Sequence, residues 1–118
     1  MNFSEQLNSG LDMVLEEKKK PQLTEKQIQT DIMDYLRILG ASADVTTMGY
    51  YGNNGMADIV GCFEGKYFAI EVKRPGNYPT PLQKKWLEEK RKAGAVAFIA
   101  TSVNDVKLNL LNLIYLED

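Results

Sequence analysis

Residues 55–74 read Gly55-Met-Ala-Asp-Ile-Val-Gly-Cys-Phe-Glu-Gly-Lys-Tyr-Phe-Ala-Ile-Glu-Val-Lys-Arg74, and this stretch predicts a β-hairpin. Two runs, 57–63 and 66–74, are rich in the β-branched and aromatic residues that strands favour. Glu64-Gly65 lies between them, and glycine readily adopts the positive φ that a tight hairpin turn requires. We therefore expect two antiparallel strands joined by a two-residue turn.

The length of this turn sets the register of the hairpin, because Phe63 then faces Lys66. The same register places Asp58 opposite Glu71. Side chains alternate across a strand, so Lys73 projects from the same face as Glu71. The opposite face is expected to be the core side of the sheet, and it carries Ile59, Phe63, Phe68, Ile70 and Val72.

Two carboxylates and a lysine are thus expected on one patch of the sheet. Like charges directly opposite each other destabilise a sheet, and a divalent cation would offset their repulsion. Mg²⁺ prefers oxygen ligands and commonly takes one or two carboxylates together with water and substrate phosphates. The alternative interpretation is a solvated strand face on which Glu71 and Lys73 form an ordinary ion pair.

The composition is that of one ordinary globular domain, with 118 residues, 44% of them hydrophobic and 25% charged. No apolar run approaches the roughly 20 residues that span a bilayer, and the first residues do not have the pattern of a signal peptide. The single Cys62 cannot form an intramolecular disulfide and suits a reducing cytoplasm. The chain has no histidine, which excludes imidazole catalysis and most zinc sites.

The overall charge does not by itself indicate a nucleic-acid partner. The net charge is −2 and the pI is about 5.2, whereas strong nucleic-acid binders are basic. Local basic clusters and a bound metal ion would still let one face attract phosphates. The clusters, each of which also fits a solvated surface, are Lys18-Lys19-Lys20, Lys73-Arg74, Lys84-Lys85 and Lys90-Arg91-Lys92.

Helices and a short strand are predicted before the hairpin. Residues 3–18 carry apolar residues at helical spacing, so 1–20 is expected to be an accessory helix that packs on its own subunit or forms a dimer contact. Thr24 to Gln27 matches a capping box, and the helical pattern continues to Gly40. Residues 43–48 predict a short strand.

After the hairpin, Thr80, Pro81 and Gln83 match a second capping box that starts a helix over 81–93, with Leu82 and Trp86 facing inward. The apolar run 95–100 predicts a strand buried on both faces, followed by a last helix capped by Ser102. The intervening helix allows this strand to pair in parallel. The sequence therefore predicts one α/β (α+β) domain over 1–118, a mixed four-stranded sheet flanked by helices.

The order of Asp58, Glu71-Val72-Lys73 and Gln83 on an αβββαβ framework resembles the PD-(D/E)XK nucleases, which have a restriction-endonuclease-like core. Within that superfamily the resemblance is to the VRR-NUC (virus-type replication-repair nuclease) group, of the stand-alone phage or bacterial type. Ala57 stands where the name-giving proline would be, a position at which many members vary. The resemblance covers roughly residues 22–107, on the stretches Thr24–Leu36, Gly55–Asp58, Glu71–Gly76, Pro81–Trp86, Gly94 and Ser102.

This resemblance implies a metal-dependent nuclease and a role for each matching residue. Asp58, Glu71 and the backbone carbonyl of Val72 would hold Mg²⁺ or Mn²⁺. Lys73 would position or activate the attacking water. Gln83 would orient Lys73 or the substrate.

Further candidates lie outside this cluster. By the resemblance, Glu25 on the first core helix would complete the site through metal-bound water; its alternative role is that of a first-turn acid favoured by the helix dipole. Arg74 and Lys84 are candidate DNA contacts. Tyr50 and Tyr51, in the glycine- and asparagine-rich loop 49–55, are candidates for stacking on a base, or else fold back on the domain.

The function implied is that of a DNA endonuclease, structure-specific in the manner of a Holliday-junction resolvase, in replication, repair or recombination. Its expected partners are DNA, branched or not, and a second copy of the chain, with no membrane, in the cytoplasm (of the host if the chain is phage-encoded). Two other classes are open. One is a catalytically silent nucleic-acid-binding or scaffolding domain that keeps the fold, and the other is an acidic metal- or phosphate-binding protein. The intact Asp58, Glu71 and Lys73 favour the nuclease.

Overall fold

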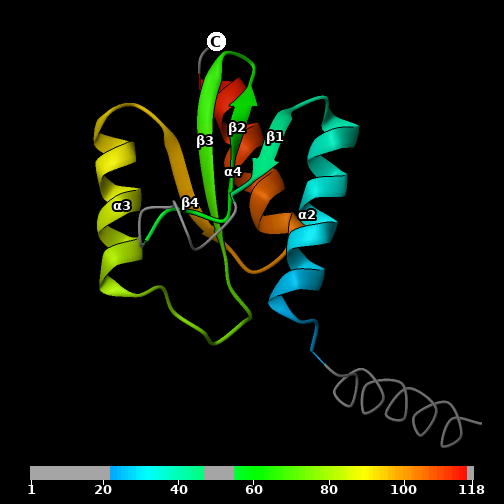
Figure 1. The fold of residues 1–118 in the computed structure, drawn as a ribbon. Helices are drawn as coiled ribbons and strands as arrows, with labels where there is room; N and C mark the ends of the chain where they lie inside the picture. The colour runs from blue at the N-terminus through cyan, green and yellow to red at the C-terminus, as the bar shows by residue number, and fades with distance from the viewer. Residues whose placement is uncertain (1–21, 47–54, 117–118) are drawn as a thin grey trace, which may run out of the picture.

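The computed structural model describes residues 22–46 and 55–116, with side chains described as far as Leu111. The predicted helix over 3–18 and the predicted stacking residues Tyr50 and Tyr51 lie outside these ranges. In chain order (Figure 1), the elements are α2 (Glu25–Leu39), β1 (Ser42–Val45), β2 (Ile59–Phe63), β3 (Lys66–Val72), α3 (Pro81–Lys92), β4 (Val96–Ala100) and α4 (Val103–Leu116).

The strands form one four-stranded sheet in the order β1-β2-β3-β4. β1, β2 and β3 are antiparallel neighbours, and β4 is parallel to β3. α3 makes the crossover that a parallel pair requires. The predicted fold class is therefore confirmed: a mixed four-stranded sheet, flanked by helices, with the order αβββαβ.

The central hairpin has the predicted two-residue turn, because Phe63 pairs with Lys66 and Ile59 with Ile70. Both turn residues have positive φ, 51° at Glu64 and 77° at Gly65, as a type I′ turn requires. The predicted strand bounds 57–63 and 66–74 were too long. The strand β2 begins at Ile59, so Asp58 lies just before it, and β3 ends at Val72.

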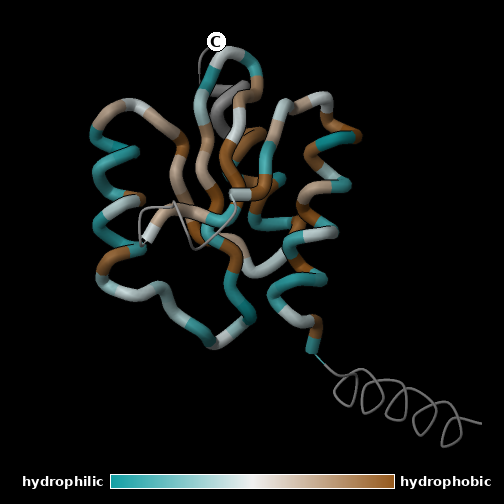
Figure 2. Tube along the Cα trace, in the orientation of Figure 1, coloured by the Kyte–Doolittle hydropathy of each residue, from teal (hydrophilic) through white to brown (hydrophobic). Residues whose placement is uncertain are grey.

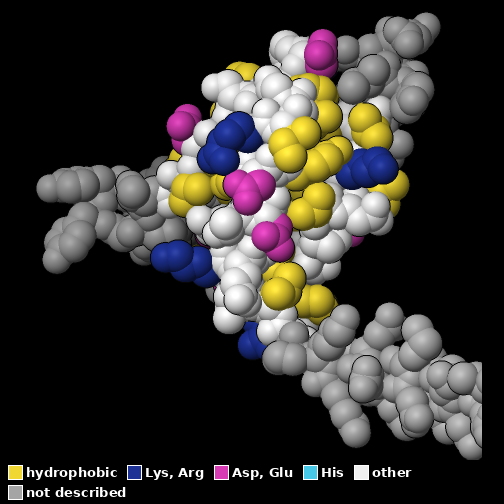
Figure 3. All heavy atoms as spheres, turned by 90° about the vertical axis from the view of Figure 1, so that its right-hand side faces the viewer, with side chains coloured by type: hydrophobic (Ala, Val, Ile, Leu, Met, Phe, Trp, Pro, Cys, Tyr) yellow, Lys and Arg dark blue, Asp and Glu magenta, His cyan; other side chains and the backbone are white. Residues whose placement is uncertain are grey.

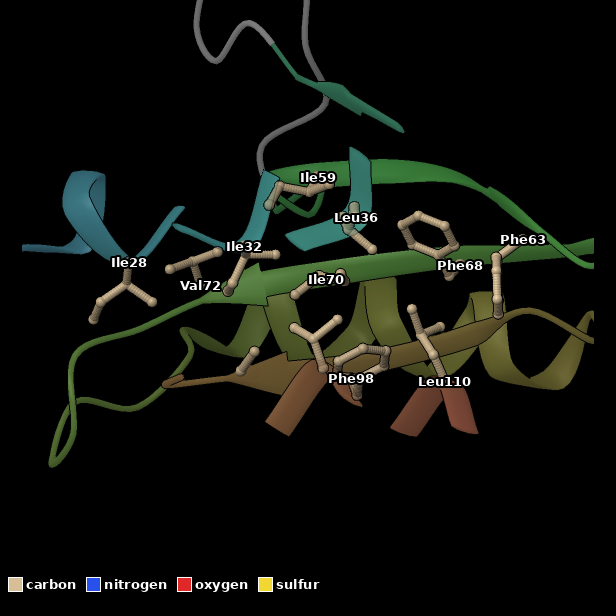
Figure 4. Close-up of a cluster of buried hydrophobic side chains, with 12 residues drawn as sticks. Ile28, Ile32, Leu36, Ile59, Phe63, Phe68, Ile70, Val72, Phe98 and Leu110 are labelled. Carbon is tan, nitrogen blue, oxygen red and sulfur yellow. The ribbon is translucent and has the colours of Figure 1, made fainter. Parts of the chain in front are cut away.

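The main core lies on the face of the sheet that α2 and α4 cover. From α2, the side chains of Ile28, Ile32 and Leu36 point toward the strands (Figure 4). Apolar residues spaced by three or four positions form one stripe of a helix, so this face of α2 is the one that packs. The predicted core side of the hairpin is confirmed, since at most 9% of each residue is exposed for Ile59, Phe63, Phe68, Ile70 and Val72.

The helix α3 covers the other face of the sheet through a smaller cluster, in which Leu87 packs with Ala69 and Ala97. The polar residues of α3 dominate its colouring in Figure 2. The expectation that Leu82 faces inward was wrong, because it is 56% exposed whereas Leu87 is 2% exposed. The least exposed positions of α3 are 83, 86, 87 and 90, of which only Leu87 is buried, and Leu82 lies beside this stripe.

The remaining element bounds differ slightly from the prediction. β1 ends at Val45, and β4 begins at Val96 rather than at 95. Helix α3 ends at Lys92, with Ala93 as its C-terminal cap. None of the helices in the described part of the chain is long and apolar enough to cross a membrane.

Candidate metal and active site

Glu71 is a buried carboxylate on the α3 side of the sheet. Only 1% of the residue is exposed, although its neighbours on β3, Ile70 and Val72, point into the main core on the opposite face. Strand alternation explains the opposite directions. Burying a carboxylate is unfavourable unless hydrogen bonds and opposite charges compensate, so the surroundings of Glu71 define the site.

One oxygen of Glu71 is partnered and the other is not. Gln83 Nε2 donates a hydrogen bond to Glu71 Oε1 over 3.1 Å, and Lys73 Nζ lies 3.6 Å from the same oxygen. Glu71 Oε2 is buried and has no hydrogen-bond partner among the described residues. Buried polar atoms are nearly always satisfied in folded proteins, so this oxygen requires a further partner, either a proton shared with the side chain of Asp58 or a bound cation.

Asp58, the residue just before β2, belongs to the same cluster. Its Oδ2 accepts a hydrogen bond from the backbone N–H of Val72 over 2.9 Å, and its backbone carbonyl accepts one from the N–H of Thr46 over 2.8 Å. Burial and the negative charge of Asp58 raise the pKa of Glu71 to about 8, although Lys73 acts in the opposite direction. The two carboxylates therefore interact directly.

The chain before Asp58 packs tightly against the start of α3. Gly55 is buried with φ at +103°, and a Cβ atom placed there would lie 2.7 Å from the carbonyl oxygen of Leu82. Only glycine combines this φ with so close an approach. The helix start that carries Gln83 thus also fixes the segment leading to Asp58.

Gln83 enters the cluster from the first turn of α3, where the predicted capping box is present. The N–H of Gln83 donates to Thr80 Oγ1 over 3.2 Å, and Gln83 Oε1 accepts from the N–H of Thr80 over 2.8 Å. Its remaining amide group, Nε2, is the one that donates to Glu71. Gln83 thus contacts Glu71, whereas the resemblance assigned it to Lys73 or the substrate.

The structure does not bring Glu25 into this cluster. Glu25 is exposed, as the first residue of α2. Across residues 22–46 and 55–116, no group of three or more acidic or cysteine side chains is arranged to hold a metal ion. A role for Glu25 through water stays a prediction.

The candidate DNA-contacting residues that are described lie on the surface. Arg74 is exposed, and its Nη2 donates to Gln22 Oε1 over 3.1 Å. Lys84 is exposed on α3, one residue after Gln83. Neither side chain joins the acidic cluster.

A separate apolar cavity of about 220 Å³ lies between the starts of α2 and α4. It does not include Asp58, Glu71 or Lys73, so the acidic cluster is a different site. The cavity is lined by Gln22, Leu23, Ile28, Asp31, Pro75, Thr101, Ser102 and Val103.

The chemistry of the cluster fits a hard divalent cation. Asp58 and Glu71 supply carboxylate oxygens, which Mg²⁺ and Mn²⁺ prefer. A cation would partner the buried Oε2 of Glu71 and would offset the burial and the repulsion from Asp58 that together raise the pKa of this side chain. Lys73 would then remain as a positive charge beside the cation.

Three supporting residues were not recognised from the sequence as parts of the site. Thr46 and Gly55 hold the segment that carries Asp58, and Thr80 holds Gln83. The capping-box spacing was the available signal for Thr80. A glycine three residues before an acid was a weak signal for Gly55, and nothing in the sequence indicates that Thr46 reaches Asp58.

No protein-family model matches the sequence, and no curated protein matches it. Solved structures do match. A protein described as a VRR_NUC domain is 26% identical with a TM-score of 0.63, over 73% of this chain and 92% of that one. A second VRR_NUC domain protein is 23% identical with a TM-score of 0.58, over 80% of this chain and 88% of that one.

A third match is Hjc, a Holliday junction resolvase from Archaeoglobus fulgidus. It is 25% identical with a TM-score of 0.50, over 64% of this chain and 65% of the resolvase. The chain therefore has a VRR-NUC/PD-(D/E)XK nuclease-like fold.

Proposed function

We propose that this chain is a divalent-metal-dependent nuclease that hydrolyses DNA phosphodiester bonds at the cluster of Asp58, Glu71 and Lys73. The observation that carries the proposal is Glu71 Oε2, a buried carboxylate oxygen beside a second carboxylate, for which residues 22–46 and 55–116 supply no hydrogen-bond partner. A solvated ion pair, the alternative for this strand face, would leave Glu71 exposed, but only 1% of the residue is exposed. The fold shared with VRR_NUC proteins supports the same conclusion.

The residues that would hold the cation, Mg²⁺ or Mn²⁺, are Asp58, Glu71 and the backbone carbonyl of Val72. When bound, such a cation acidifies water and polarises a phosphoryl oxygen. Asp58 is held for this role by the Val72 N–H. Glu71 is held by Gln83 on one oxygen, which leaves Oε2 to the cation.

Lys73 would stabilise the charge that develops on the phosphate and orient the attacking water. Its side chain is 14% exposed, so the amine is shielded from bulk water yet open to a ligand. A positive charge is worth more in such a site than in water. Lysine suits this role because its ammonium is a compact point charge with several donors.

The proposed substrate is DNA, in branched form. One solved structure that matches this fold is a Holliday junction resolvase, and this likeness supports the proposal of a role in replication, repair or recombination. The exposed Arg74 and Lys84 are the nearest basic side chains in sequence to Lys73 and Gln83. We propose that they contact the DNA backbone.

We further propose that the chain acts as a homodimer, which would place two sites on two strands. A candidate surface lies on the α2–β1 side, where Figure 3 shows hydrophobic side chains gathered between charged ones. There Ile38 of α2 is 86% exposed and Val45 of β1 is 43% exposed. β1 is an edge strand of the sheet. Sedimentation of the full chain and of Ile38→Glu tests this, and the variant should shift toward monomer.

The central test is cleavage of labelled linear, flap and four-way-junction DNA by the full chain, with Mg²⁺, with Mn²⁺ and with EDTA. We expect cleavage that EDTA abolishes and that is strongest on branched DNA. Lys73→Ala should remove it while thermal unfolding stays cooperative. DNA binding without cleavage would instead favour a catalytically silent domain, and cation binding without either would favour a metal-binding protein of another function.

A further inference from the structure

Both polar groups of the Gln83 side-chain amide make hydrogen bonds. Its Oε1 accepts a hydrogen bond from the backbone N–H of Thr80 over 2.8 Å, and its Nε2 donates to Glu71 Oε1 over 3.1 Å. A flipped amide would bring an oxygen against the carboxylate and an NH₂ group against the Thr80 N–H, and neither pair can form a hydrogen bond. The Thr80 N–H therefore determines that Gln83 presents a donor to Glu71.

The same chain contains a second capping box that lacks this third bond. At the start of α2, Thr24 N–H donates to Gln27 Oε1 over 2.8 Å, and Gln27 N–H donates to Thr24 Oγ1 over 3.1 Å. Gln27 is exposed, and its side chain makes no further hydrogen bond within the described ranges. A capping box is therefore sufficient to start a helix without the bond that Gln83 adds.

We propose that Thr80 is a positioning residue of the nuclease site: it holds the Gln83 amide so that Nε2 fixes Glu71 Oε1 and leaves Oε2 for the cation. This inference rests on the proposed function. It assigns the capping box of α3 a second task besides starting the helix. Residues that orient a metal ligand typically contribute about 10-fold to 100-fold to metal affinity or activity.

Proline substitutions distinguish the two roles of the capping box of α3, which are to start the helix and to orient Gln83. Thr80 has φ −69° and ψ 162°, and Thr24 has φ −72° and ψ 160°, so φ at both positions is compatible with the value of about −65° that proline requires. Thr80→Pro removes the N–H that orients Gln83 and also the cap hydroxyl. Thr24→Pro removes the same two groups from α2 and is the matched control. Thr80→Val removes the hydroxyl alone and keeps the orienting N–H.

Three measurements on the full chain test the proposal: Mn²⁺ affinity by calorimetry, cleavage rate at saturating Mn²⁺, and the NMR signals of the Gln83 side-chain amide in the metal-free protein. We expect both Thr80→Pro and Gln83→Leu to weaken Mn²⁺ binding by about 10-fold to 100-fold, and Thr80→Pro to shift the Gln83 amide signals. Thr24→Pro should lose a similar amount of thermal stability, yet keep the Mn²⁺ affinity and the Gln83 amide signals of the unmodified chain. Thr80→Val should keep Mn²⁺ affinity closer to that of the unmodified chain.

The outcomes are distinguishable. If Thr80→Pro and Thr24→Pro bind Mn²⁺ equally well while Gln83→Leu does not, Thr80 is structural only and the proposal is wrong. Unchanged Gln83 amide signals in Thr80→Pro would overturn it as well, whether or not a metal binds. If the unmodified chain neither binds Mn²⁺ nor cleaves DNA, the proposed function fails and the role of Thr80 in it fails too, even where the amide signals show that Thr80 orients Gln83.

Discussion

The carboxylate of Asp58 is hydrogen-bonded to the backbone of Val72, whose N–H donates to Asp58 Oδ2 over 2.9 Å. Val72 lies between Glu71 and Lys73, so this single bond joins the start of β2 to the two other charged members of the cluster. It uses one oxygen of Asp58, and the same side chain also interacts with Glu71. The placement of the Asp58 carboxylate relative to Glu71 therefore depends on a backbone group. The backbone is stiffer than side chains, so this placement is well defined.

Asp58→Asn is expected to remove the negative charge of this residue while keeping its hydrogen bond to Val72. An asparagine oxygen can still accept the hydrogen bond from the Val72 N–H, but the substitution removes the negative charge that a cation requires. We expect cleavage to fall by at least about 100-fold while stability changes little, because the hydrogen bond to Val72 is kept. Single-turnover cleavage and urea denaturation measure the two effects.

The matched variant is Asp58→Ala, which leaves the Val72 N–H unsatisfied. It should lose about 1–3 kcal/mol of unfolding free energy relative to Asp58→Asn. Equal stability of the two variants would show that the bond between Asp58 and Val72 does not hold the site.

The stability of the metal-free protein should decrease as pH rises between about 4.5 and 8. The pKa of Glu71 is raised from 4.5 to about 8 by burial and by Asp58. In this pH range the folded chain keeps a proton that the unfolded chain has released, so the contribution of this group is lost as pH rises. Glu71→Gln removes the titration. Urea denaturation at several pH values should give stabilities that converge at low pH and separate progressively between about pH 4.5 and 8, with the variant more stable.

Cation binding should show the opposite dependence on pH. The ligand form of Glu71 is the carboxylate, so a bound cation must displace the proton that the side chain holds below a pH of about 8. We expect Mn²⁺ affinity to rise toward pH 8 and close to one proton to be released per ion at neutral pH. Calorimetry in two buffers with different ionisation enthalpies counts that proton, and an affinity independent of pH would contradict the prediction.

Lys73 should contribute to catalysis more than to folding. Its amine lies 3.6 Å from Glu71 Oε1, close to the carboxylates that would hold the cation. Lys73→Ala is expected to lower the single-turnover cleavage rate by about 10²-fold to 10³-fold, the usual effect of losing a group that stabilises transition-state charge. Lys73→Arg keeps the charge but not the compact ammonium, so it should restore only part of the rate. Full activity in Lys73→Ala would remove this residue from the mechanism.

Gly55→Ala should destabilise the protein more than a change at an ordinary left-handed glycine. A Cβ at residue 55 would lie 2.7 Å from the Leu82 carbonyl oxygen, whereas one at Gly65 would meet nothing within 4 Å. Both have positive φ, so Gly65→Ala carries only the left-handed penalty of about 1–2 kcal/mol. Chemical denaturation of both variants isolates the contact with α3, and an equal loss in both would show that the contact contributes nothing.

Much of the fold was predictable because it depends on interactions between near neighbours in the chain. The Glu64-Gly65 turn determined the register of the hairpin, and the alternation of residues 59–72 determined its core face. The two Thr–x–x–Gln boxes marked the starts of α2 and α3. The inward face of α3 was predicted correctly at Trp86, which packs against the smaller cluster, and wrongly at Leu82, which lies one position beside that face.

By itself, the sequence determined the hairpin, the two capped helices and the placement of Asp58, Glu71 and Lys73 on one patch, since turn geometry and strand alternation are local. Only the tertiary structure decided that Glu71 is buried with one oxygen unpartnered by the part of the chain that the structure describes, that Gln83 donates to it, and that Glu25 is exposed. These contacts depend on how α2 and α3 pack on the sheet. Such packing is set by the fit of many side chains across the core, which no local pattern encodes.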